Sequence, residues 1–313
     1  MKENSILKKS LLSFILIITG YISGVYSFSQ QVWPINIITA NRNAAIAESL
    51  SVNFDKYGAY SNLDGKREVP CPAQDSSTAV ILVLGQSNSA NHAEKKFDTQ
   101  FPENVLNYYR GKCYSAKSPL LGSSGLEGEY LTLMGDALIK KGQMSNVILI
   151  AKSIGGSTVS DWANQGRLTP GLVSTLSMIK SNYRITNVIW HQGESDFTNN
   201  TSQGEYRKSF QELKSILTQG NVTAPISMFI STICGYNSAW TAQNPVTSAQ
   251  KSLVNNRDVF LGVDTDATLV TNDRRPQSPS QEPNCHLSNQ GQLKVAELMS
   301  NRIIDLLNFE KIK

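Results

Sequence analysis

The sequence has few charged residues and no block of one charge, which argues against a disordered charged tail and against a nucleic-acid-binding surface. Asp, Glu, Lys and Arg make up 17% of the 313 residues, and nothing in their order indicates a disordered tail. The formal net charge is +4, of which Lys2, Glu3, Lys8 and Lys9, in a predicted N-terminal targeting segment, supply +2. The remaining +2 forms no basic stripe, so we expect no nucleic-acid partner.

Histidine and cysteine are too few and too scattered to predict a metal site. The chain has three histidines, His92, His191 and His286, and its four cysteines show no CxxC spacing. No cluster of histidines and carboxylates has the spacing of metal ligands. We therefore expect no metal ion.

After the N-terminus, the sequence has no apolar run long enough to span a bilayer. At the N-terminus, Lys8 and Lys9 precede an apolar stretch from Leu11 to Val25, and Val25-Tyr26-Ser27 has small residues at the positions that a signal peptidase reads. We predict a signal peptide over residues 1–27, with an uncleaved anchor as the alternative. The protein is then exported, periplasmic or secreted, without stable membrane insertion once the signal is removed.

Export makes disulfide bonds the expected state of the four cysteines. An even set in an oxidising compartment predicts two disulfides, with three possible connectivities. The positions of the cysteines relative to the expected strands favour Cys71–Cys113 and Cys234–Cys285. The second bond would tie the loop that carries His286 to the sheet.

From residue 78 onward, apolar runs alternate with amphipathic patterns. Predicted strands cover 79–84, 104–109, 146–151, 185–190, 225–232 and 258–263. Predicted helices cover 129–142, 171–182, 203–218, 240–255 and 288–307. Such alternation predicts an α/β fold, with parallel strands joined by right-handed crossovers and helices on both faces. We expect an N-terminal extension over residues 28–77 and a single domain over 78–313.

The most informative segment is 79–88, where a predicted strand ends in a polar turn. The apolar run 79–84 is typical of a strand buried on both faces, and Gly85 follows it at once. Gln86, Ser87 and Asn88 would then emerge at the carboxyl end of the strand, where open α/β sheets bind ligands and hold nucleophiles. A Ser/Asn turn is common, but a second polar cluster follows another strand at 190–196, and His286 comes late in the chain.

A serine nucleophile needs a base within hydrogen-bond reach, because a free hydroxyl is a poor nucleophile at neutral pH. His286 is the best placed, in a loop directly before the last predicted helix. His92 is expected to point elsewhere, and His191 closes a strand and could equally be a core histidine. The Ser87 N–H, the glycine-rich loop 122–128 and the Gln192 side chain could donate hydrogen bonds to an oxyanion.

Gly-Gln-Ser-Asn at 85–88, Trp-His-Gln-Gly-Glu-Ser-Asp at 190–196 and the late His286 together resemble the SGNH hydrolase superfamily. The resemblance covers roughly residues 79–300 and is nearest to the branch of sialate O-acetylesterases and related acetylxylan esterases. It implies a three-layer α/β/α, flavodoxin-like fold with a mainly parallel sheet. It also implies cofactor-free hydrolysis of acetyl esters on sugars, so that an acetylated carbohydrate is the expected partner.

The resemblance also implies a role for individual residues. Ser87 would be the nucleophile and His286 the base, with the Ser87 N–H and Gln192 in the oxyanion hole. The family's oxyanion glycine falls in the loop 122–128, where Gly125 and Gly128 both fit. A His286 in this role would accept the Ser87 proton and pass it to the leaving sugar oxygen.

One position departs from the superfamily pattern. The superfamily usually carries Asp three residues before the catalytic histidine, and this chain has Pro283 there. Glu194 or Asp196, the neighbouring Glu282, or a backbone carbonyl in a Ser–His dyad could orient the imidazole instead. We favour the dyad or Glu194 over Glu282. The departure also permits a secreted carbohydrate-binding protein that keeps the fold with lost or weak catalysis.

Several aromatic residues are candidates for stacking against a sugar ring. Trp162, Trp190, Tyr236 and Trp240 fall near the predicted site segments, although each also suits core packing. The sequence has no evident apolar lid segment of the kind that would favour a lipid or other non-sugar ester. A sugar ester is therefore the expected substrate.

Overall fold

The computed structural model describes residues 19–21, 23–26, 53–234, 240–278 and 281–312, with side chains except at 276–278, 281–284 and 308–312. The chain divides into two units, Met1–Asn53 and Phe54–Lys313. In the first unit, the described residues 19–21 and 23–26 are helical. Within the described part of the chain, no helix has both the length and the apolar composition needed to cross a membrane.

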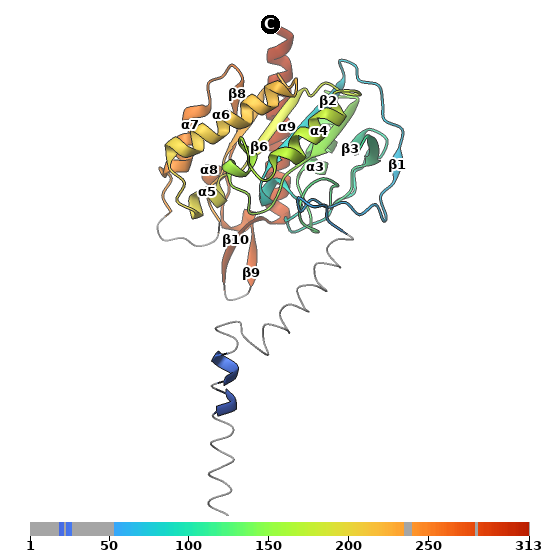
Figure 1. Cartoon of the computed structure of the whole chain (residues 1–313). Helices are drawn as coiled ribbons and strands as arrows, with labels where there is room; N and C mark the ends of the chain where they lie inside the picture. Colours follow the sequence, from blue (N-terminus) through green and yellow to red (C-terminus); the bar gives the residue numbers. More distant parts are fainter. Residues whose placement is uncertain (1–18, 22, 27–52, 235–239, 279–280, 313) are drawn as a thin grey trace, which may run out of the picture. The chain divides into compact units, whose positions relative to one another are not determined.

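An eight-stranded, mainly parallel sheet forms the centre of the second unit (Figure 1). In spatial order its strands are β1 (Glu68–Val69), β4 (Lys112–Ser115), β3 (Val105–Tyr109), β5 (Asn146–Ala151), β2 (Thr78–Gly85), β6 (Asn187–His191), β7 (Ile226–Ile230) and β8 (Val259–Asp264). Neighbouring strands pair in parallel along the series β3, β5, β2, β6, β7 and β8. Strand β4 pairs antiparallel with both β3 and β1. The six predicted strands are confirmed, and β1 and β4 extend the sheet beyond them.

Helices cover both faces of the sheet and complete a three-layer α/β/α fold (Figure 1). One face carries α3 (Leu131–Lys140) and α9 (Asn289–Ile312). The other carries α4 (Thr169–Ile179), α6 (Gln203–Gln219) and α7 (Pro245–Leu253). These are the five predicted helices, and the predicted fold class is confirmed. Shorter elements are η1 (Ser87–Ser89), η2 (Val159–Trp162), α5 (Glu194–Thr198), α8 (Thr265–Thr268) and η3 (Thr271–Asp273).

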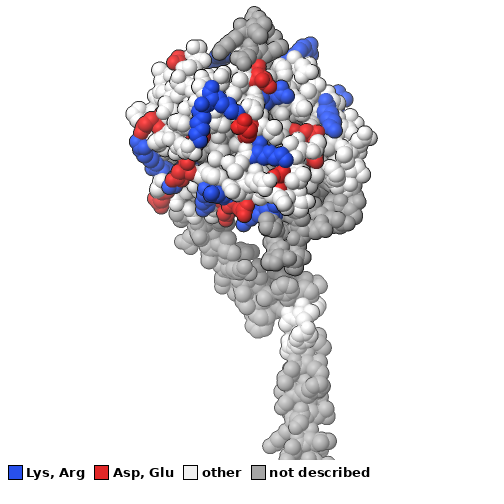
Figure 2. Space-filling view, turned by 180° about the vertical axis from the view of Figure 1, so that it is seen from behind, with Lys and Arg blue, Asp and Glu red and all other residues white. Residues whose placement is uncertain are grey.

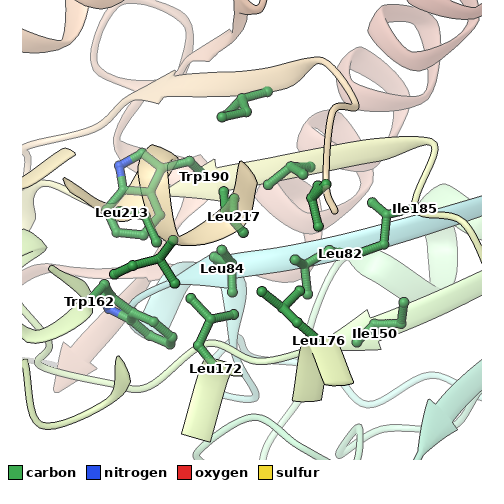
Figure 3. Packing of buried hydrophobic residues seen from close by; sticks show 14 of the residues in the cluster. Leu82, Leu84, Ile150, Trp162, Leu172, Leu176, Ile185, Trp190, Leu213 and Leu217 are labelled. Carbon is green, nitrogen blue, oxygen red and sulfur yellow. The ribbon is translucent and has the colours of Figure 1, made fainter. Parts of the chain in front are cut away.

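Strand β2 lies between β5 and β6 and is buried along its whole length. Figure 3 shows Leu82 and Leu84 of β2 among side chains of α4 and α6, including Leu172, Leu176 and Leu213. Because helices cover both faces of the strand, an unbroken apolar run is favoured over an alternating one. Full burial of each such leucine contributes about 1.5–3 kcal/mol, so the central strand is held rigidly where it meets its terminal turn.

Trp162 and Trp190 belong to this core rather than to a sugar-binding surface. Both indoles are fully buried, and they pack edge to face with ring centroids 6.3 Å apart. The Trp162 N–H donates to Ser157 Oγ and the Trp190 N–H to Tyr206 Oη, each at 3.0 Å. The expectation that these two residues could stack on a sugar is therefore wrong. Trp240 is half-buried, and Tyr236 lies outside the described residues.

A two-stranded hairpin precedes α9 and carries His286. Its strands are β9 (Arg274–Ser278) and β10 (Gln281–Leu287), which pair antiparallel with Pro283 opposite Pro276. His286 therefore lies in a strand, and the prediction that it lies in a loop is wrong. In Figure 1 the hairpin extends from the sheet region that also holds α5 and α8.

Both predicted disulfides are confirmed. Cys71 is joined to Cys113 of β4, next to the pairing of Val69 with Cys113. Cys234, which follows β7, is joined to Cys285 of β10. The second bond therefore connects the His286 strand to the segment that follows β7, next to the edge strand β8.

Charged side chains of both signs are interspersed on the face shown in Figure 2. Lys141, directly after α3, forms an ion pair of 2.8 Å with Glu297 of α9. Exposed pairs of this kind contribute at most about 1 kcal/mol each. The apolar contacts between the helices and the sheet therefore dominate the stability of this layer.

Candidate active site

The turn after β2 places Ser87 at the carboxyl edge of the sheet. Gly85 has φ +137°, and a Cβ there would lie 2.0 Å from the backbone oxygen of His191. Only glycine fits this close approach to β6. The next residue, Gln86, donates its N–H to the same His191 oxygen at 3.0 Å, and Ser87 then begins η1. The sharp turn brings the serine out of the strand and into a pocket.

That pocket has a volume of about 690 Å³ and brings distant parts of the sequence together. Ser87 comes from the β2 turn, His92 from the segment that follows it, and His286 from β10. The remaining lining residues are Lys56, Tyr57, Gly58, Gln86, Ser124, Ile154, Gly155, Gly156, Arg167, Leu168, Ser195, Cys234 and Cys285. The predicted nucleophile and the predicted base therefore share one cavity.

His286 is held at the pocket through its neighbour Cys285. The Cys285 carbonyl accepts hydrogen bonds from Asn88 Nδ2 at 2.9 Å and from Arg274 at 3.1 Å. Burial, with a smaller contribution from the charges of His92 and Arg275, lowers the pKa of His286 to about 4. At neutral pH the imidazole is therefore unprotonated, which is the form that a general base needs.

His92 lines the same pocket, contrary to the expectation that it points elsewhere. Its ring stacks on that of His286, with centroids 5.3 Å apart, and its Nε2 lies 3.0 Å from Ser124 Oγ. Burial lowers the pKa of His92, and the charge of Glu127 partly opposes the shift. Two neutral imidazoles can stack without charge repulsion. The spacing of five residues from Ser87 gave no signal of this contact, because it depends on the turn that follows η1.

His191 lies in the core beneath the pocket. Its ring stacks on Phe229 with centroids 4.0 Å apart, and burial lowers its pKa to about 3. Its ring nitrogens lie 3.4 Å from Tyr130 Oη and from Ser231 Oγ. Both ring nitrogens have partners, so this geometry fits the alternative that His191 is a core histidine.

The structure does not bring every predicted oxyanion donor to the pocket. The Gly128 N–H donates to the Ala93 carbonyl at 3.0 Å, so it is already occupied. Gly125 has φ +89°, and a Cβ there would lie 2.8 Å from His92 Nε2, which places it just behind the pocket wall. Among the described acceptors, none takes a hydrogen bond from the N–H of Ser87 or Gly156, and both residues line the pocket.

Gln192 is turned into the protein interior. Its Nε2 donates to Gln86 Oε1 at 3.2 Å, to the Ser157 carbonyl at 3.1 Å and to Asp196 Oδ2. The residue is fully buried and is not part of the pocket lining. The geometry therefore places Gln192 as a brace between the β2 turn and α5 rather than beside Ser87.

Glu194 reaches the pocket indirectly. Its Oε1 accepts hydrogen bonds from Asn88 Nδ2 at 2.7 Å and from Ser231 Oγ at 2.8 Å. The Asn88 amide also donates to Cys285, so it links Glu194 to the residue before His286. Burial raises the pKa of Glu194 to about 7. Glu194 thus supports the strand that carries the histidine.

The other predicted carboxylates are placed differently. Asp196 Oδ2 accepts the N–H of Val159 at 2.8 Å as well as the Gln192 amide, so it joins η2 to α5. The side chain of Glu282 lies outside the described residues. Among the residues that were described, no group of three or more His, Cys, Asp or Glu side chains is arranged to hold a metal ion.

Comparison with known proteins identifies what this chain resembles. Residues 77–305 match the family model described as "Carbohydrate esterase, sialic acid-specific acetylesterase". A solved protein from Arabidopsis thaliana has a TM-score of 0.53 and 15% identity, over 73% of this chain and 98% of that one. The structure of NanS has a TM-score of 0.51 and 14% identity, over 76% and 99% of the two chains. These likenesses support the fold, and no curated protein matches the chain.

Proposed function

The chain belongs to the carbohydrate esterase family described as sialic acid-specific acetylesterases, and we propose that it removes O-acetyl groups from sugars through an acetyl-serine intermediate. It is a carboxylic ester hydrolase. The observation that carries the finer proposal is the shared pocket of Ser87 and His286, in which the imidazole is neutral at physiological pH. The proposed substrate is an O-acetylated sialic acid or polysaccharide.

The proposed reaction begins with proton transfer from Ser87 Oγ to His286. The serine oxygen attacks the acetyl carbonyl carbon, and the carbonyl oxygen becomes an oxyanion. The Ser87 N–H is a preorganised donor for that charge, with the N–H of Gly156, which also lines the pocket, as a second donor. When the tetrahedral intermediate collapses, the sugar oxygen leaves with the proton from His286.

Hydrolysis of the acetyl-enzyme uses the same groups. His286 removes a proton from water as the water oxygen attacks the acetyl carbon, and acetate leaves as Ser87 regains its proton. We propose that Glu194 positions the histidine through Asn88 and Cys285, so that this chain works without an aspartate at position 283. Ser87 and His286 then form a catalytic dyad, and Glu194 and Asn88 hold the backbone next to His286 in place.

We also propose that the protein is exported. Two disulfides fit an oxidising compartment. In this proposal residues 1–27 are a signal peptide and residues 78–313 are the hydrolase domain. The extension 28–77 contributes β1 and Cys71 to the same unit.

The test is acetate release by the purified protein from O-acetylated sugars, including O-acetylated sialic acid and acetylated xylan fragments. We expect release by the wild type and a loss of at least about a thousandfold in Ser87→Ala. Ser177→Ala, on the exposed side of α4, is the matched control and should match the wild type. No release from any acetyl ester, including a small activated one, would overturn the proposal. That result would favour a carbohydrate-binding protein that has lost catalysis. Pro283, which stands where the superfamily usually has aspartate, is the sequence feature that supports this alternative.

A further inference from the structure

A second cavity adjoins the Ser87 pocket and has no part in the reaction described above. Its volume is about 200 Å³, and it lies among β3, β5, α4 and the segment 55–57. Lys56 and Tyr57 line both cavities. Tyr57 packs against α4 at Gly171, where a Cβ would lie 3.0 Å from the tyrosine ring. The ring of Tyr57 is therefore a wall that the two cavities share.

The second cavity contains a buried lysine. Lys152 directly follows β5 and is 6% exposed, and among the described residues none accepts a hydrogen bond from its Nζ or forms an ion pair with it. The Nζ lies 5.3 Å from the centroid of the Tyr57 ring. A cation–π contact returns less free energy than the removal of an ammonium from water costs. A buried and unpaired ammonium of this kind favours the binding of an anion.

The other charged groups around this cavity leave it positive. Arg110 and Lys56 line it together with Lys152, and Asp55 is the single carboxylate among its lining residues. Asp55 Oδ1 already accepts the N–H groups of Tyr57 at 2.9 Å and Ala59 at 3.0 Å. Burial and the charge of Arg110 lower the pKa of Lys152, while Asp55 raises it. Asp55 thus stabilises the local turn, and its single negative charge offsets only part of the positive charge of the three basic residues that line the cavity.

We propose that this cavity is a carboxylate subsite of the esterase, in which Lys152 and Arg110 bind the acid group of an O-acetylated acidic sugar. The inference rests on the proposed function, because that function places the acetyl ester beside Ser87. Ile154, two residues after Lys152, lines the Ser87 pocket, so the two sites are adjacent along one strand end. A volume of about 200 Å³ has room for a carboxylate and a short substituent.

The kinetic test compares an O-acetylated acidic sugar with its methyl ester at the carboxylate. We expect the wild type to prefer the free acid by at least about tenfold in kcat/KM, mainly through KM. Lys152→Met and Arg110→Gln should each reduce that preference severalfold. Lys180→Met, at the exposed end of α4, removes a charge outside the cavity and should retain it. Arg110 is exposed, so its variant decides the question if Lys152→Met does not fold.

A binding test separates the two proposals. Calorimetric titration of the Ser87→Ala protein with sialic acid, glucuronic acid, acetate and glucose needs no catalysis. Binding of an acidic sugar, weakened by Lys152→Met or Arg110→Gln, would support the subsite even if no ester were hydrolysed. Binding of acetate alone would reassign the cavity to the product and overturn the substrate proposal. A preference for the free acid that survives in both variants, or no preference in the wild type, would also overturn it.

Discussion

Burial sets the protonation states of the titratable residues around Ser87. It lowers the pKa of His286 to about 4 and raises that of Glu194 to about 7. The first shift keeps the proposed base unprotonated over a wide pH range. The second means that both charge states of Glu194 are populated near neutral pH, and its Oε1 can accept hydrogen bonds in either state. Neither shift can be read from the sequence, because each depends on packing by residues that are distant along the chain.

The pH profile should report the lowered pKa of His286. A general base works only when unprotonated, so activity is lost as pH falls through the pKa of the base. We expect the acid limb of kcat/KM to lie near pH 4 to 5, well below the ordinary histidine value. The measurement is kcat/KM on an acetylated sugar from pH 3 to 9, with circular dichroism to exclude unfolding. An acid limb at pH 6.5 or above would contradict the assignment.

Two substitutions at Glu194 separate its role as an acceptor from its charge. Glu194→Gln keeps an oxygen that can accept from Asn88 and Ser231, whereas Glu194→Ala removes the acceptor and leaves buried donors unpaired. We expect the alanine variant to lose at least about tenfold in kcat and about 1–3 kcal/mol of stability. The glutamine variant should lose much less of both. Equal losses in the two variants would show that the charge, rather than the acceptor, is what matters.

At the scale of elements, the hairpin β9–β10 is the part that the sequence conceals. The segment 274–287 contains prolines and polar residues without an alternating apolar pattern, so it gave no strand signal. By contrast, β2 was predictable because its apolar run is unbroken. The edge strand β1 and its neighbour β4 were also missed, since each is short. Local patterns therefore predicted the central layers, while the elements that deliver His286 depend on tertiary contacts.

The two disulfides should have different effects. Cys234–Cys285 ties β10 beside the pocket, whereas Cys71–Cys113 joins the outer edge of the sheet. Replacing Cys234 and Cys285 by serine should lower kcat at least about fivefold, because His286 loses its anchor. The double replacement at 71 and 113 should cost about 2–4 kcal/mol of stability with kcat near that of the wild type. Kinetics and urea unfolding distinguish the outcomes, and equal effects on kcat would contradict this division of roles.

At the scale of the whole molecule, much of the site could be predicted because the α/β pattern implies parallel strands, whose carboxyl ends lie at one edge of the sheet. The carboxyl ends of β2 and β6 are adjacent in the sheet, so the segments 85–88 and 190–196 had to meet. Side-chain direction could not be predicted in the same way. Gln192 faces the interior and His92 faces the pocket, because the backbone turns at Gly193 and after η1 decide their orientation.

The proposed export makes a prediction about the N-terminal residue of the mature protein. A signal peptide over residues 1–27 implies that the exported chain begins at Phe28. N-terminal sequencing of the protein recovered from the extracytoplasmic fraction measures this directly. A chain that retains Met1 and sediments with membranes would support the uncleaved anchor instead.

The most direct test of the account is covalent labelling of Ser87 by a phosphonate that mimics the tetrahedral intermediate. The mass of the intact wild-type protein should increase by one phosphonyl group, and peptide mapping should place it on Ser87. Ser87→Ala should remain unlabelled, and an O-acetylated sugar should slow the labelling of the wild type. A label on another residue, or none on a protein that still releases acetate, would contradict the proposed nucleophile.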